Sequence, residues 1–177
     1  MFDKQPLNPE QEEQRLKALY SYDILGEGLE NELDNLVKLA AQIANVPIAY
    51  ISFVDREEIV LKSAFGVKNE YKVLPRHLTI CEHTMFLDHI YMVPDVRENA
   101  YLSDYKVFSL SKGILFYASA PLKDADGYAL GCLSLLDTAP KQLNANQLDA
   151  LNALIVAYFM DYGCCPHQLN LIDKYFS

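Results

Sequence analysis

The chain has 177 residues, which suits one domain with a single hydrophobic core and is short for two of ordinary size. Hydrophobic residues make up 51% and charged residues 22%, a composition that disfavours a disordered or low-complexity chain. The formal net charge of −9 disfavours nucleic acid and anionic membrane surfaces as partners, because the summed field repels phosphate groups.

Two helices are predicted at the start of the chain. Asn8 is a good N-cap residue and Pro9 suits the first helical position, so a helix is expected to begin near Pro9 and to end by Gly26. A second helix is predicted up to Pro47 from apolar residues at helical spacing: Leu29, Leu33, Leu36, Val37, Ala40, Ile43 and Ala44.

Two neighbouring strands follow. Residues 47–54, PIAYISFV, are almost continuously apolar, which is typical of a central strand covered on both faces. After the polar turn at residues 55–57, residues 58–66 contain enough β-branched and aromatic residues to pair back as a hairpin.

The middle of the chain predicts a helical insert. Thr79 and Glu82 have the spacing of a capping box, which predicts a short helix reaching about Leu87. A weaker strand is expected over residues 90–93. Residues 94–112 have no steady period and are expected to form loop and short helix over the concave side of the sheet.

A hairpin and a helix complete the pattern. Strands are predicted over residues 115–121 and 128–136, joined by a turn in which Gly127 supplies a positive φ. Asn144 opens a last helix that is expected to end near residue 163. The order predicts an α+β fold with terminal helices on one face of an antiparallel sheet, the insert on the other, and a pocket between insert and sheet.

The termini and cysteines indicate a cytoplasmic protein. No apolar run approaches the ~20 residues that a membrane helix needs, and the start MFDKQPLNPEQEEQ is polar and acidic, unlike a signal peptide. In the cytoplasm the four cysteines are expected to be reduced thiols: Cys81, Cys132, Cys164 and Cys165.

A series of short motifs runs through about residues 12–160, and their order and spacing are more specific than any one motif. They are EQRLKALYSYDIL, LVKLAA, VPIA, ISFVD, Lys62-Ser63, Gly66, Pro75-Arg76, Cys81-x-His83-Thr84, Val93-x-Asp95, FYA, PL, Asp126-Gly127, Leu130-Gly131, Leu136-Asp137 and Leu143. With these motifs the chain resembles the GAF family of small-molecule sensing domains, in the branch found at the input ends of bacterial histidine kinases and diguanylate cyclases.

The resemblance implies a six-stranded antiparallel sheet between a helical layer, often used for dimerisation, and a pocket-forming layer. We expect a sensor domain over residues 1–163, with its core at 12–160, and a C-terminal tail at 164–177. The family's tryptophan before Lys62-Ser63 is absent, and Cys132-Leu133-Ser134 stands where Thr-Leu-Cys is usual. The identity of a ligand is therefore not carried over from the family.

The candidate pocket comprises residues from the strands and the insert: Ser52, Lys62, Phe65, Arg76, Cys81, His83, Thr84, Asp95, Tyr117, Ser119 and Cys132. The strand hydroxyls alternate with apolar neighbours, so they either face a ligand or pack within the sheet. Lys62 and Arg76 either meet an anionic ligand or reach solvent. Asp95 follows a proline and is expected to cap a turn rather than act as a base.

Cys81 has two interpretations. At the start of a helix its pKa is lowered, which favours a redox or adduct site, whereas a reduced cysteine often simply fills space in a core. Bilin attachment is disfavoured because Glu82 separates Cys81 from His83. A metal site is not predicted, because Cys81 and His83 point to nearly opposite sides of a helix and CCPH at residues 164–167 lacks the usual gap between zinc thiolates.

The sequence therefore predicts a stand-alone sensory or regulatory domain that binds an unidentified small molecule, with no chemistry of its own and an unknown cofactor. It is expected to act through a homodimer formed by the terminal helices, or through a partner protein. Two alternatives stay open. One is a dimerisation or interaction module without a ligand; the other is a thiol enzyme of the free methionine sulfoxide reductase type, which requires Cys81 and Cys132 to meet.

Overall fold

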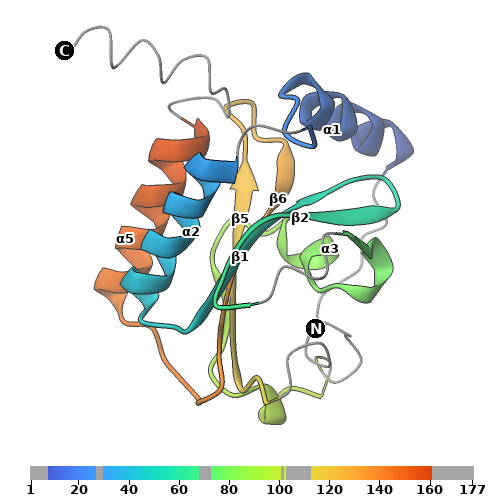
Figure 1. The fold of residues 1–177 in the computed structure, drawn as a ribbon. Helices are drawn as coiled ribbons and strands as arrows, with labels where there is room; N and C mark the ends of the chain where they lie inside the picture. The colour runs from blue at the N-terminus through green and yellow to red at the C-terminus, as the bar shows by residue number, and fades with distance from the viewer. Residues whose placement is uncertain (1–7, 27–29, 68–72, 101, 103–112, 161–177) are drawn as a thin grey trace, which may run out of the picture.

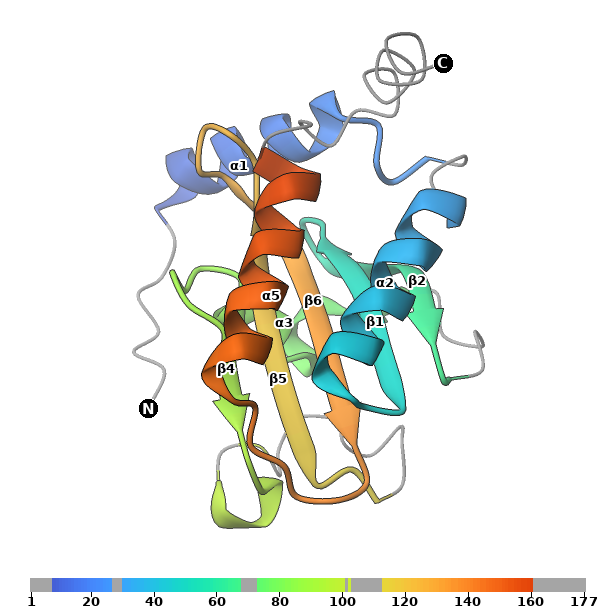
Figure 2. The same ribbon diagram turned by 90° about the vertical axis from the view of Figure 1, so that its left-hand side faces the viewer.

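A computed structural model of the chain describes residues 8–26, 30–67, 73–100, 102 and 113–160. Within these residues, six strands form one antiparallel sheet in the order β3-β2-β1-β6-β5-β4. Helices α2 and α5 lie side by side on one face of the sheet, and α3 lies on the other (Figures 1 and 2). This α+β arrangement confirms the fold class predicted from the sequence.

The first two helices have different positions. Helix α1 (Pro9–Ser21) begins as predicted, with the Asn8 side chain accepting a hydrogen bond from the Glu10 amide at 3.0 Å. It lies across one end of the sheet, so the helix beside α5 is α2 (Figure 2). Helix α2 (Glu30–Ala44) ends at Asn45, whose φ of 52° is left-handed.

Strand β1 (Ile48–Val54) is central, as its continuous apolar run predicts, because it pairs with β2 (Glu58–Phe65) on one side and with β6 (Ala129–Asp137) on the other. The pairing with β2 shifts its register after residue 51. An additional edge strand, β3 (Val73–Pro75), pairs with β2. The sequence gives no signal for β3, since three residues ending in proline show no alternation.

The insert begins differently from the prediction. It contains the 3₁₀-helix η1 (Arg76–Leu78) and the four-residue helix α3 (Cys81–Thr84), whose N-cap residue Ile80 makes no side-chain capping hydrogen bond. The predicted capping box is therefore wrong: the Thr79 hydroxyl donates instead to the Arg76 carbonyl at 3.2 Å. This bond closes η1, so the threonine ends one helix rather than beginning the next.

The rest of the insert and the last hairpin complete the sheet. Strand β4 (Tyr91–Val93) forms the second edge beside β5 (Phe116–Lys123), and the 3₁₀-helix η2 (Val96–Glu98) follows β4. The β5–β6 turn has the predicted positive φ at Gly127, 86°. Its backbone is held by the buried Asp124 carboxylate, which accepts hydrogen bonds from two amides of the turn at 3.1 and 2.8 Å.

Helix α5 (Ala145–Ile155) continues into the π-helix η4 (Val156–Met160). Its predicted start is confirmed by a complete capping box between Asn144 and Gln147. The predicted end near residue 163 and the tail at 164–177 lie outside the described residues. No helix in the described part of the chain is both long enough and apolar enough to cross a membrane.

The main hydrophobic core lies between the sheet and the pair α2 and α5. β1 turns Ala49, Ile51 and Phe53 toward it, and the Phe53 ring meets the Phe159 ring edge-on with centroids 6.3 Å apart. This face of the sheet is lined by apolar side chains. The opposite face buries hydroxyls and thiols as well as apolar side chains.

Candidate functional site

The sheet face that looks toward α3 carries a buried group of hydroxyls and thiols. Because side chains alternate along a strand, the residues between the core positions of the three central strands point to this face. Together with two residues of α3 they form what we call the hydroxyl–thiol cluster: Tyr50 and Ser52 of β1, Cys81 and Thr84 of α3, Tyr117 and Ser119 of β5, and Cys132 and Ser134 of β6. All eight side chains are buried.

Thr84 connects α3 to the sheet through this cluster. Its Oγ1 lies 2.9 Å from the Ser119 Oγ and 3.4 Å from the Cys132 Sγ. The same hydroxyl lies 3.3 Å from the Ile80 carbonyl, to which it donates. A helix of only four residues is thus held on the sheet by polar contacts as well as by apolar packing.

Cys81 lies at the centre of the cluster. Its Sγ is 3.4 Å from the Ser52 Oγ and 3.9 Å from the Ser134 Oγ. The Cys132 Sγ also lies 3.8 Å from the Cys81 carbonyl oxygen. The two thiols, which come from different elements, therefore meet beneath the first turn of α3.

These contacts separate the acidities of the two thiols. The hydrogen bond from Cys132 lowers the pKa of Cys81 to about 7 against the opposing effect of burial, and the Ser52 and Ser134 hydroxyls lower it further. Burial raises the pKa of Cys132 well above that of an ordinary thiol. The lowered pKa of Cys81 agrees with the interpretation from the sequence, but hydrogen bonds to the sulfur are its cause.

The other titratable groups facing Cys81 are phenols. Burial, followed by the charge of Cys81, raises the pKa of Tyr50 and of Tyr117. Both rings are therefore neutral at physiological pH. They can donate hydrogen bonds, and neither contributes a formal charge to the cluster.

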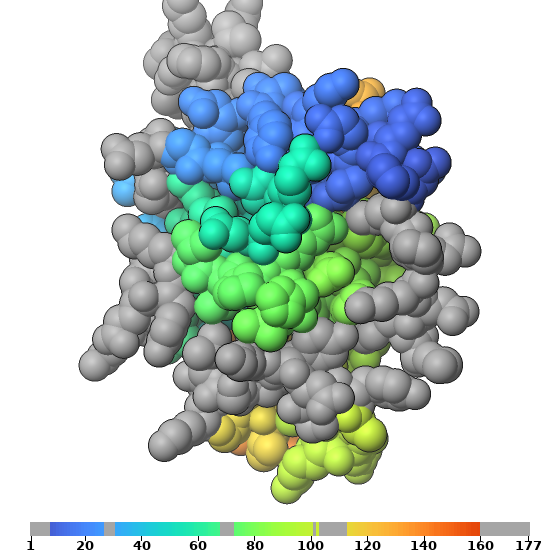
Figure 3. All heavy atoms as spheres, turned by 90° about the vertical axis from the view of Figure 1, so that its right-hand side faces the viewer, coloured from blue at the N-terminus to red at the C-terminus, as the bar shows by residue number. Residues whose placement is uncertain are grey.

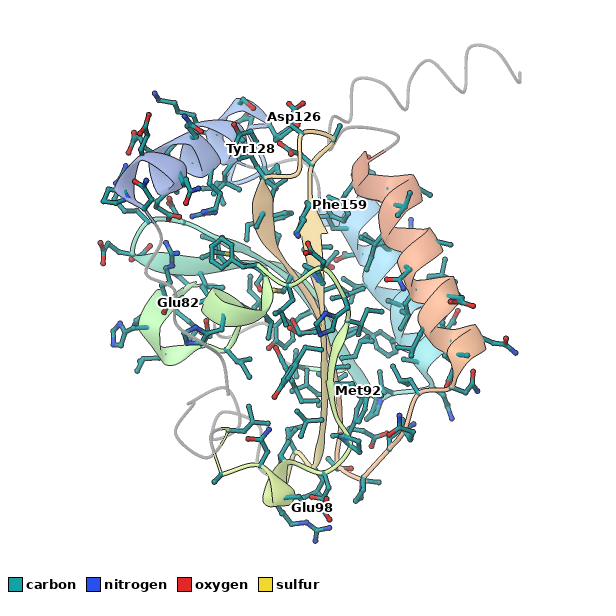
Figure 4. All side chains as sticks on the ribbon, turned by 180° about the vertical axis from the view of Figure 1, so that it is seen from behind. Glu82, Met92, Glu98, Asp126, Tyr128 and Phe159 are labelled. Carbon is teal, nitrogen blue, oxygen red and sulfur yellow. The ribbon has the colours of Figure 1, made fainter. Side chains whose placement is uncertain are left out.

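Apolar side chains enclose the cluster on two sides. One group packs around the two tyrosines and the other around the two cysteines; the first is Ile80, Val93, Leu102, Ile114 and Leu136, and the second is Val54, Ile59, Met85 and Ala129. Viewed from behind in Figure 4, α3, marked by Glu82, lies across the sheet from α5 and Phe159. The low dielectric of such surroundings strengthens the hydrogen bonds within the cluster.

Two predicted basic residues lie outside the cluster. The Arg76 guanidinium forms an ion pair with Glu12 of α1 at 2.6 Å and also donates to the Asp55 carbonyl at 3.2 Å. This agrees with Figure 3, where the segment containing η1 and α3 lies against α1 and the β1–β2 turn. The Lys62 ammonium donates to the Gly26 carbonyl, in the segment after α1.

Three more predicted residues are also separate from the cluster. Phe65 is exposed at the end of β2, and His83 is half-buried on α3. Asp95 caps η2 by accepting a hydrogen bond from the Arg97 amide at 3.0 Å, which confirms its predicted role in a turn. The cluster thus contains six of the predicted residues: Ser52, Cys81, Thr84, Tyr117, Ser119 and Cys132.

Sequence reasoning missed Tyr50 and Ser134, which are hydrogen-bonded to each other. Both are two residues from a predicted position on the same strand, Tyr50 from Ser52 and Ser134 from Cys132. The period of two was therefore the signal that would have found them. In the described residues, no three His, Cys, Asp or Glu side chains gather closely enough to hold a metal ion; Cys164, Cys165 and His167 lie outside them.

Comparison with known proteins gives one family and a consistent fold. Residues 28–157 match the sequence profile of the GAF domain. The chain is 26% identical over 136 residues to a cyclic di-GMP phosphodiesterase of Pseudomonas aeruginosa; the match covers 77% of this chain but 23% of that protein. The chain therefore spans about a quarter of the length of this curated relative.

Two solved structures share the fold at low sequence identity. The GAF domain of an Acinetobacter phosphoenolpyruvate-protein phosphotransferase has a TM-score of 0.56 at 14% identity, covering 91% of this chain and 94% of that one. A free methionine-R-sulfoxide reductase of Neisseria meningitidis, solved with its substrate, has a TM-score of 0.58 at 16% identity, covering 88% and 92%. The same fold thus occurs as one domain of a phosphotransferase and as a free methionine-R-sulfoxide reductase.

Proposed function

This chain belongs to the GAF domain family, and we propose that it binds a small, uncharged polar molecule against the hydroxyl–thiol cluster. GAF domains are commonly sensory or regulatory parts of signalling proteins, and the chain is assigned that role here. Its signal would pass through a homodimer or a partner protein. The proposal also places the domain in the cytoplasm, where its thiols are kept reduced.

The difference between the two faces of the sheet carries the proposal. On the α2 and α5 side, β1 buries Ala49, Ile51 and Phe53, as a packing face should. On the α3 side, the same strand buries the hydroxyls of Tyr50 and Ser52. Burying a hydroxyl costs free energy that an apolar side chain of similar size does not, so a purely structural face has no need of this chemistry.

The chemistry of the cluster selects the ligand class. The hydroxyls and the Cys132 thiol both donate and accept hydrogen bonds. The guanidinium of Arg76 and the ammonium of Lys62, which were predicted for the site, bind protein oxygens elsewhere. A neutral ligand with both donors and acceptors suits this group. Because the side chains of the cluster contact one another, the ligand must replace some of these contacts and displace α3, which supplies a conformational signal.

Ligand binding can be tested by thermal unfolding in the presence of neutral amino acids, nucleosides and haem-like cofactors, together with mass spectrometry of small molecules that copurify. A ligand at a hundred times its Kd is expected to stabilise the fold by about 2.7 kcal/mol. Ser119→Val is expected to remove the stabilisation. Ser21→Ala, which removes a surface hydroxyl bonded to the Ala18 carbonyl, should retain it. Equal stabilisation of both variants would place the ligand elsewhere, and no stabilisation by any compound would favour an interaction module.

The sequence led us to expect a homodimer through the first and last helices. Because α1 lies across the end of the sheet and α2 lies beside α5 (Figure 2), we move the proposed contact to α2 and α5. Their outer surfaces expose the apolar side chains Leu39 on α2 and Val156 directly after α5, at 45% and 41%. Leu39→Glu is expected to convert dimer to monomer in light scattering at micromolar concentration. Val73→Glu is the matched control, because Val73 is equally exposed, at 47%, on the edge strand β3. A wild-type monomer would refute the dimer.

A thiol enzyme is the second candidate, and a single observation favours it. The reductase mechanism requires two thiols to meet, and the Cys132 Sγ lies 3.8 Å from the Cys81 carbonyl oxygen. The structural neighbour from Neisseria meningitidis is a free methionine-R-sulfoxide reductase. Turnover of free methionine sulfoxide with thioredoxin as reductant, lost in Cys81→Ser, would establish this activity. Turnover that survives Cys81→Ser, or none in the wild type, would exclude it.

A further inference from the structure

The two buried cysteines form a pair with unequal properties. Cys81 and Cys132 lie 51 residues apart in the sequence, on α3 and β6. The Cys132 thiol donates to the Cys81 carbonyl oxygen at 3.8 Å, and the Cys81 Sγ contacts Ser52, the cross-strand partner of Cys132. Neither side chain is exposed by more than 2%. Packing alone would be served by any small apolar residue at these positions, so the meeting of two thiols calls for a chemical explanation.

We propose that Cys81 and Cys132 are a redox-reactive dithiol that hydrogen peroxide converts into an intramolecular disulfide linking α3 to β6. This role concerns a modification rather than a bound ligand, and it does not rest on the proposed function. A disulfide here would fix α3 on the sheet. It would thereby change the position of α3 over the hydroxyl–thiol cluster.

The reaction has two steps. In the first, the Cys81 thiolate attacks one oxygen of hydrogen peroxide; the O–O bond breaks, hydroxide leaves and takes up a proton as water, and Cys81 becomes a sulfenic acid. In the second, the Cys132 sulfur attacks the Cys81 sulfur, and the S–O bond breaks. The departing hydroxide takes the proton of the Cys132 thiol and leaves as a second water. Two thiols and one peroxide thus give one disulfide and two waters.

The contacts assign these roles. The Cys81 sulfur contacts the Ser52 hydroxyl at 3.4 Å and the Ser134 hydroxyl at 3.9 Å, and hydrogen bonds from these hydroxyls favour its thiolate, the form that attacks peroxide. Cys132 stays protonated and is held in place by the Thr84 hydroxyl at 3.4 Å. The attacking thiol is therefore Cys81, and Cys132 is the resolving thiol.

Access to the buried pair depends on α3. The helix has four residues, so its own backbone hydrogen bonds are few, and it is preceded by the three-residue η1. Short segments of this kind open locally at far lower free energy than the strands beneath them. Hydrogen peroxide is only slightly larger than water, so a small opening of α3 suffices to admit it.

The test uses the full chain with Cys164→Ser and Cys165→Ser, which leaves Cys81 and Cys132 as its only cysteines. After treatment with hydrogen peroxide and alkylation of free thiols, intact-mass spectrometry is expected to show a loss of about 2 Da and no added alkyl group. Peptide mapping should identify the Cys81–Cys132 link. Unreacted thiols, a cysteine oxidised to sulfinic acid, or a disulfide between two chains would each overturn the proposal.

Single variants in the same background separate the two roles. Cys132→Ser is expected to accumulate a sulfenic acid at Cys81, which dimedone traps, and Cys81→Ser is expected to react at least about tenfold more slowly. Equal reaction at Cys132 in the Cys81→Ser variant would contradict the assignment. A disulfide that forms with methionine sulfoxide but not with peroxide would overturn this proposal and support the second candidate function, so the two fail independently.

Discussion

Arg15 is a buried cation that joins α1 to the end of the sheet. Its side chain is 3% exposed, and its Nη1 donates to the carbonyls of Val54 at 2.8 Å and Ala129 at 3.2 Å. Its Nε and Nη2 donate to the two oxygens of the Glu12 carboxylate at 2.8 and 2.7 Å. One guanidinium therefore binds the last residue of β1, the first residue of β6 and α1 itself.

Arg15→Met is expected to lower the free energy of unfolding by about 3–5 kcal/mol. Methionine keeps most of the apolar stem, so the cavity term is small and the lost polar contacts dominate. Two hydrogen bonds from a charged group contribute about 1.5–3 kcal/mol each, and removing one member of a buried pair costs about 3–5 kcal/mol because the other is left unpaired. In the Arg15→Met variant the Glu12 carboxylate still forms its ion pair with Arg76, so the expected loss lies toward the lower end of this range.

Urea unfolding followed by circular dichroism measures this effect. Arg56→Met is the matched control, because the Arg56–Glu13 pair has a similar distance, 2.8 Å, but side chains that are 54% and 50% exposed. Solvent screens such an exposed pair, so its loss is expected to have a much smaller effect on stability. A loss below about 1 kcal/mol for Arg15→Met, or equal losses for the two variants, would show that the buried guanidinium does not hold α1 on the sheet.

Three further predictions concern acidity and close packing. Alkylation of Cys81 by iodoacetamide is expected to accelerate as pH rises through about 7, because the thiolate reacts and the pKa of Cys81 is about 7; a midpoint at the ordinary thiol pKa would contradict this. Burial raises the pKa of Glu12, but hydrogen bonds from Arg15 and Arg76 lower this pKa to below the ordinary carboxyl value. The ionised carboxylate therefore stabilises the fold above the ordinary carboxyl pKa, and this stabilisation is lost as the pH falls through the lowered pKa of the folded state. Glu12→Gln should accordingly destabilise the fold at neutral pH and have little effect in strong acid, as measured by urea unfolding. Gly131→Ala is expected to cost about 3 kcal/mol or more, because the new Cβ would lie 2.0 Å from the Ser52 carbonyl oxygen. Gly127→Ala should cost only about 1–2 kcal/mol, for the positive φ at this position, since no atom lies within 4 Å of the added Cβ. A larger loss of thermal stability for Gly127→Ala than for Gly131→Ala would refute the reasoning.

Most of the fold follows from periodicity and from local turn chemistry. The continuous apolar run at residues 47–54 predicts a central strand, and the pairing of β1 with both β2 and β6 confirms it. Asn144 and Gln147 predict a helix start that the structure confirms. The predicted capping box at Thr79 failed because the hydroxyl had a competing local acceptor, the carbonyl three residues earlier. Sequence spacing alone does not decide between two such partners.

The site was predictable where it depends on strand alternation and not where it depends on long side chains. Ser52, Ser119 and Cys132 meet because residues at a period of two share a face of the sheet, whichever strands are neighbours. Lys62 and Arg76 have long, flexible side chains, and their hydrogen-bond partners, Gly26 and Glu12, lie far away in the sequence. The direction of such a side chain is set by tertiary contacts that no local pattern records.

The two faces of the sheet differ in what sequence change can do to them. The face under α2 and α5 is covered by two regular helices of 15 and 11 residues, and a substitution there alters the core on which the whole fold depends. On the other face, the described covering segments are short: α3 has four residues, and η2, whose Val96 packs beside Tyr50 and Tyr117, has three. In evolution, these segments are therefore free to be replaced or lengthened while the sheet keeps its stability. The chemistry of the domain can diverge on one side of a scaffold whose other side stays constant.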